Sequence, residues 1–494
     1  MPPLSRFRNF TLLVLAGAFA VTAVTAILAR GAWYDEFYTF YLVRPGVPFP
    51  TLWSAWLRDN HPPLFYGLIW LYAHLVPSST VAALRTFNLV VGAVAVAGIL
   101  MLGRVDSRLR AVSWYYLTAL AGLFATLDRI DQLRSYFLSL ALTALVLPLL
   151  AMVIVRGRTH GGSLVVLGVV LALAESVHLV SSVIVAGLAG AAVLGTAWLH
   201  GRNTAARLVL VVVLSLVPLA SALALQLPTM LANTHAFWLP AGWSAARWAI
   251  ENETLETLLS NRPLLLASLA GTAILFVGAV RGDRQDRESL VLIATTLGGL
   301  VLALAVLVPA HLHKPLIINR YLIAIHPVFA FALAVSASAL TRRLPALAGI
   351  AIDVVILIAA LLALHDNLER TLARPSWNGT ASAISSLVRA CPTTLVHVDT
   401  GPNAPTLDLP PRDNREVLPF AYDLVAREHG FALAAPESRT MARDCPTVFW
   451  TEHVAGQHPT ATTLITALRA QGYPITDARV RRIGDGWILI VPTP

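Results

Sequence analysis

The 494-residue chain contains little charge, and this excludes an ordinary soluble protein. Charged side chains make up 13% of its residues, about half the share usual in soluble domains, whereas apolar side chains make up 56%. A soluble protein of this composition would expose apolar patches large enough to cause aggregation. The composition therefore indicates an integral membrane protein.

Lysine is almost absent, since Lys314 is the only lysine among 36 basic side chains, against 27 acidic ones. The positive excess is uneven. Residues 366–494 hold 12 arginines and 13 acidic side chains, so their net charge is −1 and residues 1–365 carry +10. The arginines of the first part lie in short segments between apolar runs. That pattern is typical of membrane topology signals and argues against nucleic-acid binding.

Cysteine is scarce as well, with Cys391 and Cys445 as the only two. Each precedes a proline and then a strand-like run. Two thiols at the starts of neighbouring strands would form a disulfide in an oxidising compartment; otherwise they are two unrelated buried thiols. Two thiols this far apart, with no nearby cluster of histidines or cysteines, do not indicate a metal site.

Long apolar runs are what the chain has in abundance. Crossing a hydrocarbon core of about 30 Å takes roughly 20 apolar residues. The first run follows Arg6 and Arg8, and its length and the ten runs behind it favour an uncleaved anchor over a signal peptide. The predicted spans are 10–29, 86–103, 111–127, 135–155, 163–177, 179–199, 208–226, 263–280, 289–309, 321–340 and 346–364.

A shorter aromatic run, residues 64–77, decides the topology. If it crossed the bilayer, the arginine-rich loops would lie opposite Arg6 and Arg8. If it lies in the interface as an amphipathic helix, all these arginines are cytoplasmic, as the positive-inside rule prefers. We therefore expect eleven spans, a cytoplasmic N-terminus and an outer C-terminus. The outer face then receives residues 30–85, 128–134, the turn at His178, 227–262, 310–320 and the C-terminal domain.

Residues 366–494 lose the hydropathy signal and have an α/β pattern. The expected strands are 393–399, 446–451, 478–483 and 487–492, and the expected helices are 379–390, 416–429 and 461–471. The predicted fold class is therefore an all-α polytopic membrane bundle over 1–365, with its first outer loop at 30–85, and an extracytoplasmic soluble α/β domain over 366–494.

Most chemically suggestive side chains fall on the expected outer face, at one membrane depth. Carboxylates can accept a proton, whereas arginine and lysine can hold a phosphate. This mixture suits a phosphate-bearing, lipid-embedded substrate. The residues are Asp35 and Glu36; Asp59 and His61; Asp128, Asp131, Arg134 and Tyr136; and Lys314, Arg320 and Tyr321.

These motifs, in this order, resemble those of the GT-C membrane glycosyltransferases over the first 365 residues. The nearest branch is similar to the protein O-mannosyltransferases and the lipid A aminoarabinose and galacturonic acid transferases. His61 stands where the aminoarabinose transferases have lysine before Pro-Pro, so a cationic lipid A sugar is not implied. The motifs are Asp35-Glu36, His61-Pro62-Pro63-Leu64-Phe65-Tyr66, Leu133-Arg134-Ser135-Tyr136 and Arg320-Tyr321-Leu322.

The resemblance implies transfer of a sugar from a polyprenyl-phosphate carrier to an envelope glycan, lipid or protein at the outer face of the inner or plasma membrane. Asp35 would be the general base with Glu36 beside it, and Arg134 and Arg320 would hold the donor phosphate, with Lys314 a further candidate. An ionised phosphate leaving group needs no general acid. Transfer in a single displacement would invert the configuration of the anomeric carbon. The activated donor supplies the energy, and we find no nucleotide-binding motif.

Other residues keep two interpretations. His178 either lines the pocket, with Asp59, His61, Asp128, Asp131, Tyr136 and Tyr321, or is a turn residue at the interface. His311 and His313 could hold a divalent cation with an acid of the first loop, but a third ligand cannot be assigned. The reaction as argued requires no cofactor, and a divalent metal stays open.

The alternative function is a polytopic transporter or lipid flippase for envelope precursors. It would need ionisable or broken-helix sites near the bilayer midplane in related halves of the chain. Only Glu175 and Asp353 are acids well inside spans, and the chain has no internal repeat. We therefore prefer the transferase, with membrane lipids, a polyprenyl-linked sugar and an envelope acceptor as its partners.

Overall fold

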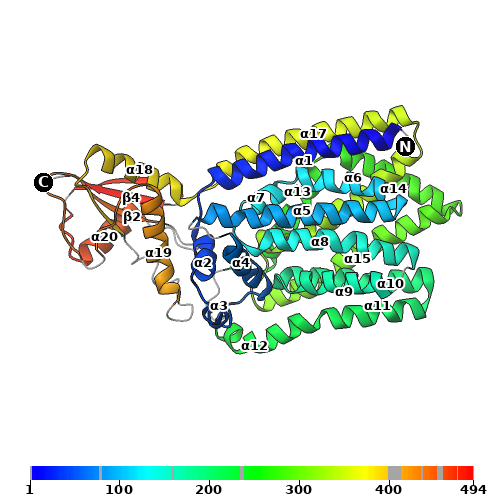
Figure 1. The fold of residues 1–494 in the computed structure, drawn as a ribbon, viewed down its shortest axis with the longest axis horizontal. Coiled ribbons are helices and arrows are strands. Elements are labelled where there is room, and N and C mark those ends of the chain that lie inside the picture. The colour runs from blue at the N-terminus through cyan, green and yellow to red at the C-terminus, as the bar shows by residue number, and fades with distance from the viewer. Residues whose placement is uncertain are drawn as a thin grey trace.

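The structure is a computed structural model that describes residues 3–76, 80–157, 161–233, 239–398, 413–435, 438–452, 460–475, 477–484 and 486–492. Within these residues, nine helical segments are long and apolar enough to cross a membrane. They form one bundle, which confirms the predicted polytopic membrane fold (Figure 1). The segments are α1 (Pro3–Ala29), α5 (Val81–Val105), α8 (Ser135–Arg156), α10 (Leu179–His200), the consecutive α11 (Arg202–Ser215) and α12 (Val217–Asn233), α14 (Arg262–Val280), α15 (Arg284–His313), α16 (Ile325–Arg342) and α17 (Ala346–Leu372).

Nine of the eleven predicted spans fall on these segments, and the other two fall on shorter helices. The run 163–177 is α9 (Gly161–Glu175). The run 111–127 is divided between α6 (Ser107–Gly122) and α7 (Phe124–Ile130), because Leu123 between them has an extended backbone. With 15 and 16 residues, α9 and α6 are each about 22–24 Å long, less than the hydrocarbon thickness.

The segment predicted to lie in the interface forms a short helix, α4 (Leu64–Leu75); residue 77 lies outside the described residues. Its 12 residues reach about 18 Å, too short to cross a bilayer. Two more short helices precede it, α2 (Tyr34–Val43) and α3 (Phe49–Trp56). All three lie at the end of the bundle that faces the C-terminal domain (Figure 1).

At the opposite end of the bundle, where the chain begins, ion pairs join neighbouring helices. Arg8 on α1 pairs with Asp353 on α17 at 2.7 Å. Arg342, the last residue of α16, pairs with Asp286 in the first turn of α15 at 2.8 Å. The loops predicted to share the side of the N-terminus therefore lie at one end of the bundle, and the short helices lie at the other (Figure 1).

Glycines allow helices to approach closely inside the bundle. A Cβ atom at Gly299 of α15 would come within 2.6 Å of the Leu188 Cα of α10, and a Cβ at Gly187 would meet Ala303 at 3.0 Å. Since lipid supplies no hydrophobic force between helices, close backbone packing of this kind stabilises the bundle.

The C-terminal domain has a four-stranded sheet with the order β1-β2-β4-β3, made of β1 (Leu395–Val398), β2 (Thr447–Thr451), β3 (Arg479–Ile483) and β4 (Gly486–Val491). β1 and β2 are parallel, while β4 is antiparallel to both of its neighbours. The helices are α18 (Trp377–Ala390), α19 (Asp413–Glu428) and α20 (Ala461–Ala470). This confirms the predicted α/β class. Residues 366–372 continue α17, so the boundary predicted at residue 365 lies within that helix.

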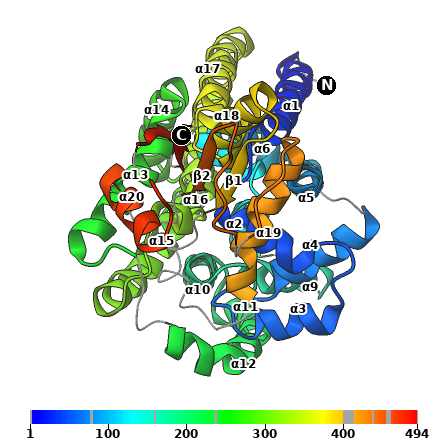
Figure 2. The same ribbon diagram turned by 90° about the vertical axis from the view of Figure 1, so that its left-hand side faces the viewer.

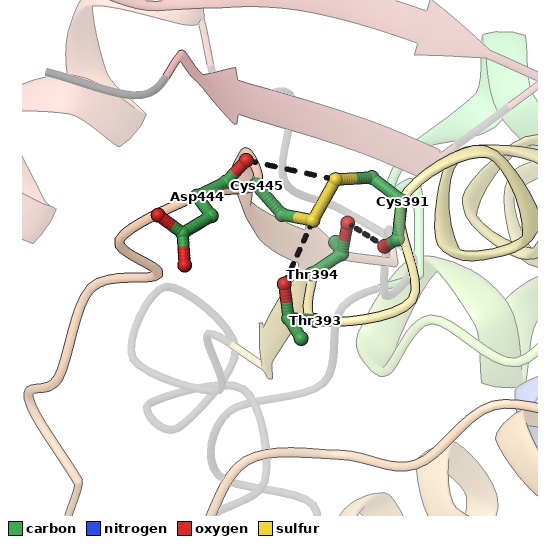
Figure 3. Close-up of a disulfide and its surroundings, with 5 residues drawn as sticks. All are labelled: Cys391, Thr393, Thr394, Asp444 and Cys445. Carbon is green, nitrogen blue, oxygen red and sulfur yellow. Dashed lines mark hydrogen bonds between the residues drawn. A yellow bond between two sulfur atoms is a disulfide. The ribbon is translucent and has the colours of Figure 1, made fainter.

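A disulfide joins Cys391, at the end of α18, to Cys445, just before β2 (Figure 3). Their Cα atoms are 5.7 Å apart. Because β1 and β2 are adjacent parallel strands, the two segments that lead into them meet at one edge of the sheet. The disulfide therefore fastens α18 to the centre of the sheet.

Candidate active site at the end of the bundle

The predicted acid pair occupies the first turn of α2, a favourable place for carboxylates because the helix dipole is positive there. The two acids have different surroundings. The side chain of Asp35 is 22% exposed, whereas Glu36 is completely buried. Successive helical residues point about 100° apart, so one short helix gives the two carboxylates separate environments.

Glu36 is held by three donors. The Arg85 guanidinium donates from Nε and Nη2 to its two oxygens at 2.8 and 2.7 Å, and the Leu133 backbone N–H donates to Oε1 at 2.7 Å. Arg85 also donates to the backbone carbonyls of Arg30 and Gly31, at the end of α1. The prediction of Glu36 as part of a catalytic pair is therefore corrected: a buried, fully hydrogen-bonded carboxylate orders the site and has no surface with which to touch a substrate.

Asp35 lies beside the two arginines predicted to bind phosphate. Arg320 Nη1 is 3.4 Å from its Oδ2 atom. Arg134 donates to the backbone carbonyl of Asp35 and to the Thr39 hydroxyl, both at 3.3 Å. Arg134 is the residue before α8, and Arg320 lies in a short 3-10 helix, η2 (Asn319–Leu322), where a transmembrane helix was expected to start. Three segments far apart in the sequence thus bring a carboxylate and two guanidinium groups together.

Aromatic rings form the wall next to this cluster. His178, at the turn before α10, lies 4.8 Å from the Tyr321 ring, 5.7 Å from the Tyr136 ring and 6.0 Å from the His61 ring, measured between centroids. Burial, followed by the nearby charges of His61, Arg134 and Arg320, lowers the pKa of His178 well below its usual value, so this imidazole is neutral near pH 7.

Two polar atoms of this wall are buried and have no hydrogen-bond partner among the described residues. They are the Nδ1 atom of His178 and the Tyr136 hydroxyl. Buried polar groups in proteins are nearly always paired. Unmet hydrogen-bonding capacity of this kind next to two arginines is what a polar ligand would satisfy.

Asp59 and His61 form a hydrogen-bonded pair in the loop before α4. The Nδ1 atom of His61 is 2.9 Å from Asp59 Oδ1, and the Tyr38 hydroxyl of α2 donates to Oδ2 at 3.4 Å. Burial raises the pKa of Asp59, but the His61 ring and the hydrogen bonds outweigh it and lower the pKa to about 2. His61 and Arg134 line the same narrow crevice.

Asp128 and Asp131, predicted to line the pocket, are instead buried in ion pairs. Asp131 is 2.7 Å from Arg30 Nη1, and Asp128 contacts Arg129 at 2.7 Å and Arg374 at 3.2 Å. Neither aspartate has exposed surface. Because they lie in and just after α7, directly before Arg134, they brace the segment that carries this arginine and do not line the site.

The predicted cation ligands do not fit a metal site. His311 Nδ1 accepts the backbone N–H groups of Leu316 and Ile317 at 3.1 and 3.0 Å, and its Nε2 donates to the Gly242 carbonyl at 3.1 Å. Both ring nitrogens are therefore used to fix the segment that leads to η2. His313 is exposed. In the part of the chain that the structure describes, no three His, Cys, Asp or Glu side chains gather as metal ligands would.

Lys314, the third candidate for the donor phosphate, is half-buried at the end of α15. The structure shows no ion pair of its side chain with any described residue. The segment that follows it leads to Arg320, so Lys314 lies upstream of the cluster without a contact that assigns it a role.

An apolar groove of about 360 Å³ begins next to η2. One side is the first half of α13 (Trp243–Leu259), a helix within the segment 227–262 that was predicted as an outer loop. Glu253 of α13 contacts His326 of α16 at 2.7 Å, and Glu256 accepts the Ala125 N–H at the start of α7 at 2.8 Å. The groove is lined by Pro240, Ala241, Ser244, Ala245, Trp248, Ala249, Ile317, Ile318 and Asn319.

The structure also shows contacts around this cluster that the sequence did not predict. Arg85 and Arg30 lie in or beside apolar runs, and an arginine in such a run signals a buried partner. Tyr38 carries no such signal, because a tyrosine near an interface is common. α13 was missed because its polar residues are satisfied by contacts with distant helices.

The chain has the fold of ArnT from Cupriavidus metallidurans, a membrane bundle of the kind that the sequence resemblance implies. No protein-family model matches the chain, and no curated protein matches it by sequence. The chain is similar to ArnT from Cupriavidus metallidurans in the apo state, with a TM-score of 0.58 and 11% identity, over 98% of this chain and 99% of ArnT. ArnT bound to undecaprenyl phosphate matches with a TM-score of 0.57, the same identity and the same coverage.

Archaeal AglB from Archaeoglobus fulgidus aligns at a TM-score of 0.45 and 12% identity, over 79% of this chain and 62% of its own. The sequence resemblance covered residues 1–365. The similarity to ArnT includes the C-terminal domain as well, since it extends over nearly the whole of both chains. At 11% identity this similarity establishes a shared architecture.

Proposed function

We propose that the protein is a glycosyltransferase that moves a hexosyl or pentosyl group from a polyprenyl-phosphate carrier to an envelope glycan, lipid or protein. One observation carries the proposal. A partly exposed carboxylate, Asp35, lies 3.4 Å from Arg320 and on the same turn of chain that Arg134 binds, at one end of a membrane bundle. A proton acceptor beside two phosphate-binding cations is the set of groups this transfer requires.

The chemistry is a single displacement. The acceptor hydroxyl oxygen attacks the anomeric carbon while Asp35 takes the hydroxyl proton. The bond between that carbon and the phosphate oxygen breaks, and the polyprenyl phosphate leaves with the electron pair and the inverted sugar stays on the acceptor. Arg134 and Arg320 stabilise the phosphate as its charge grows, which lowers the barrier. An ionised leaving group needs no proton, so no second acid is required.

The groove beside η2 suits the carrier. Its lining is mostly apolar, and it ends at Asn319, the residue before Arg320. A phosphate held by Arg320 would therefore have an apolar channel next to it for the first isoprene units. The capture of undecaprenyl phosphate by ArnT, which shares this fold, supports a polyprenyl phosphate as the ligand.

The site belongs on the outer face of the inner or plasma membrane. The arginine-rich loops lie at the other end of the bundle, together with the N-terminus, and such loops are retained in the cytoplasm. The disulfide between Cys391 and Cys445 is compatible with an oxidising outer compartment for the C-terminal domain.

The test is turnover of the purified protein with a polyprenyl-phosphate sugar and membrane extract as the acceptor source. We expect transfer of label to an acceptor by the wild type and a loss of at least about a hundredfold for Asp35→Asn, because the general base is gone. The matched control is Asp366→Asn, an exposed aspartate near the C-terminal end of α17, which should retain activity.

Two results would contradict the proposal. Near-normal turnover of folded Asp35→Asn would remove Asp35 as the base. Movement of the polyprenyl lipid across liposomes without any glycosylated product would favour the transporter or flippase instead. Asp353, one of the two acids on which that alternative depends, is paired with Arg8 at the opposite end of the bundle.

A further inference from the structure

The C-terminal domain packs directly on α2, the helix that carries Asp35. Figures 1 and 2 both show α19 beside α2. One hydrophobic core includes Phe37 and Phe40 of α2 together with Trp377, Tyr422 and Trp450 of the domain. Phe37 and Phe40 are 1% and 2% exposed, although a ten-residue helix at the end of a bundle would otherwise leave its outer side in water.

A series of tilted and edge-on aromatic contacts connects the sheet to α2. Trp377, at the start of α18, lies 4.8 Å from Phe37 on one side and 4.8 Å from Tyr422 on the other, and Tyr422 lies 4.8 Å from Trp450 of β2. The backbone N–H of Trp377 also donates to the backbone carbonyl of Ala32, just before α2, at 3.3 Å. These contacts fix the beginning of α2 to the domain.

α19 holds the second half of α2. Phe420 lies 5.2 Å from the Tyr41 ring and 6.0 Å from the Phe40 ring. The Arg44 guanidinium, directly after α2, lies over the rings of Tyr41 and Phe420 at 4.1 and 5.2 Å. Edge-on aromatic pairs and cation–π contacts each add to the free energy of packing beyond the buried area.

The contacts with the domain and those with the substrate lie on opposite sides of α2. Residues 37, 40, 41 and 44 follow the 3–4 spacing of one helical face. Asp35 lies on the other face, with Thr39, which binds Arg134. From the bundle side α2 is held by the bonds of Glu36 to Arg85 and Leu133 and of Arg134 to Thr39. The domain holds the opposite side, so loosening its contacts would let α2 tilt and move the Asp35 carboxylate relative to Arg320.

We propose that the C-terminal domain is a brace for the catalytic helix, and that Phe420 and Trp377 are positioning residues that act on Asp35 through α2. This inference rests on the proposed function for the role of Asp35. It predicts that loosening the brace lowers the rate of the chemical step while donor binding is retained. Arg134, Arg320 and the groove, which bind the donor, belong to other elements.

The test uses the full-length protein and the variant Phe420→Ala, because Phe420 is only half-buried and lies at the edge of the domain core. We expect kcat to fall at least about tenfold, since small misplacements of a reacting group reduce the rate strongly, with KM for the donor within about twofold. Phe420→Leu, which refills most of the space, should recover most of the rate. Hydrogen exchange of residues 34–43 should become faster in Phe420→Ala.

The matched control is Phe449→Leu. Phe449 is a buried ring of the same domain in a separate core with Tyr473 and Leu489. It should lower the thermal stability of the domain without changing kcat or the exchange of residues 34–43. A merely structural role for the domain would make both variants lose kcat together.

The brace would be refuted if Phe420→Ala had the kcat and the exchange of the wild type, or if Phe449→Leu reproduced its effects. If Phe420→Ala did not fold, Tyr41→Ala, which removes the same ring contact from the α2 side, would replace it in this comparison. If the wild type had no transferase activity, only the proposed function would be refuted. The hydrogen-exchange measurement would still test the brace, because it needs no substrate.

Discussion

Asp35 and Glu36 are neighbours with the same functional group, yet the structure assigns them opposite surroundings. Asp35 is partly exposed beside Arg320, while Glu36 is buried with Arg85 and the Leu133 N–H. The bond to Leu133 matters because Arg134 follows directly. One buried carboxylate thereby sets the positions of both the base and a phosphate-binding arginine.

Replacing each of these two acids with its amide should have a different effect. Glu36→Gln leaves the Arg85 charge buried without a counter-charge, a change that costs about 3–5 kcal/mol. We expect a clear drop in the thermal unfolding temperature in detergent together with lost activity. Asp35→Asn should lose activity at an unchanged unfolding temperature. Equal stability of the two variants would contradict the structural role of Glu36.

A double variant tests whether Glu36 and Arg85 act as a pair. Replacing both partners in Glu36→Gln/Arg85→Met removes the uncompensated charge, so the double variant should recover part of the lost stability. Additive losses in the double variant would show that Glu36 and Arg85 do not act as a pair.

Membership of the candidate site could be predicted for residues that stand in recognisable local motifs. Asp35, Arg134 and Arg320 were singled out from the residues around them, and the structure brings them together. The burial of Glu36, Asp128 and Asp131 was not predictable, because each depends on an arginine or a backbone group that only the folded chain brings near. The sequence similarly suggests His311 as a metal ligand, whereas in the structure its ring accepts backbone N–H groups of the segment before η2.

At the scale of elements, long apolar helices and the strands of the C-terminal domain were predictable, since both depend on repeated local patterns. The division between α6 and α7 was not. It depends on the Glu256 carboxylate of α13, which accepts a hydrogen bond from Ala125 at the start of α7. A helix end fixed by a partner more than a hundred residues away leaves no local signal.

The groove formed by α13 leads to a prediction about the carrier. Trp248 is 63% exposed and lines the groove. Trp248→Ala should raise KM for a long polyprenyl-phosphate sugar by about tenfold, because about 1–2 kcal/mol of apolar contact is lost. KM for a short, water-soluble prenyl donor should change little. The control is Trp198→Ala, which replaces a tryptophan near the end of α10 that is 75% exposed, and it should affect neither donor.

At the scale of the whole molecule, the bundle has two unlike ends. One end carries the N-terminus and ion pairs between helices, and the other carries α2, α4 and the C-terminal domain (Figure 1). Which end faces the cytoplasm stays a prediction from loop charge.

The orientation can be tested with introduced cysteines, because the two native ones are joined in a disulfide. Ser386→Cys on α18 should react with a membrane-impermeant maleimide in intact cells. Asn203→Cys, at the start of α11, should react only after the membrane is opened. Both positions are exposed in the structure. The reverse labelling pattern would place the C-terminal domain in the cytoplasm.

The contact between α2 and α19 also orders events during synthesis. α2 is complete once residue 43 has been made, but Phe420 follows some 380 residues later. At about 5–20 residues per second, the ribosome needs on the order of tens of seconds to cover this interval. A nascent chain would insert most of its helices with Phe37 and Phe40 still uncovered. A truncated product ending before α18 would hold α2 from the bundle side alone, through Glu36 and Arg134, and we expect its activity to stay low however well its bundle had assembled.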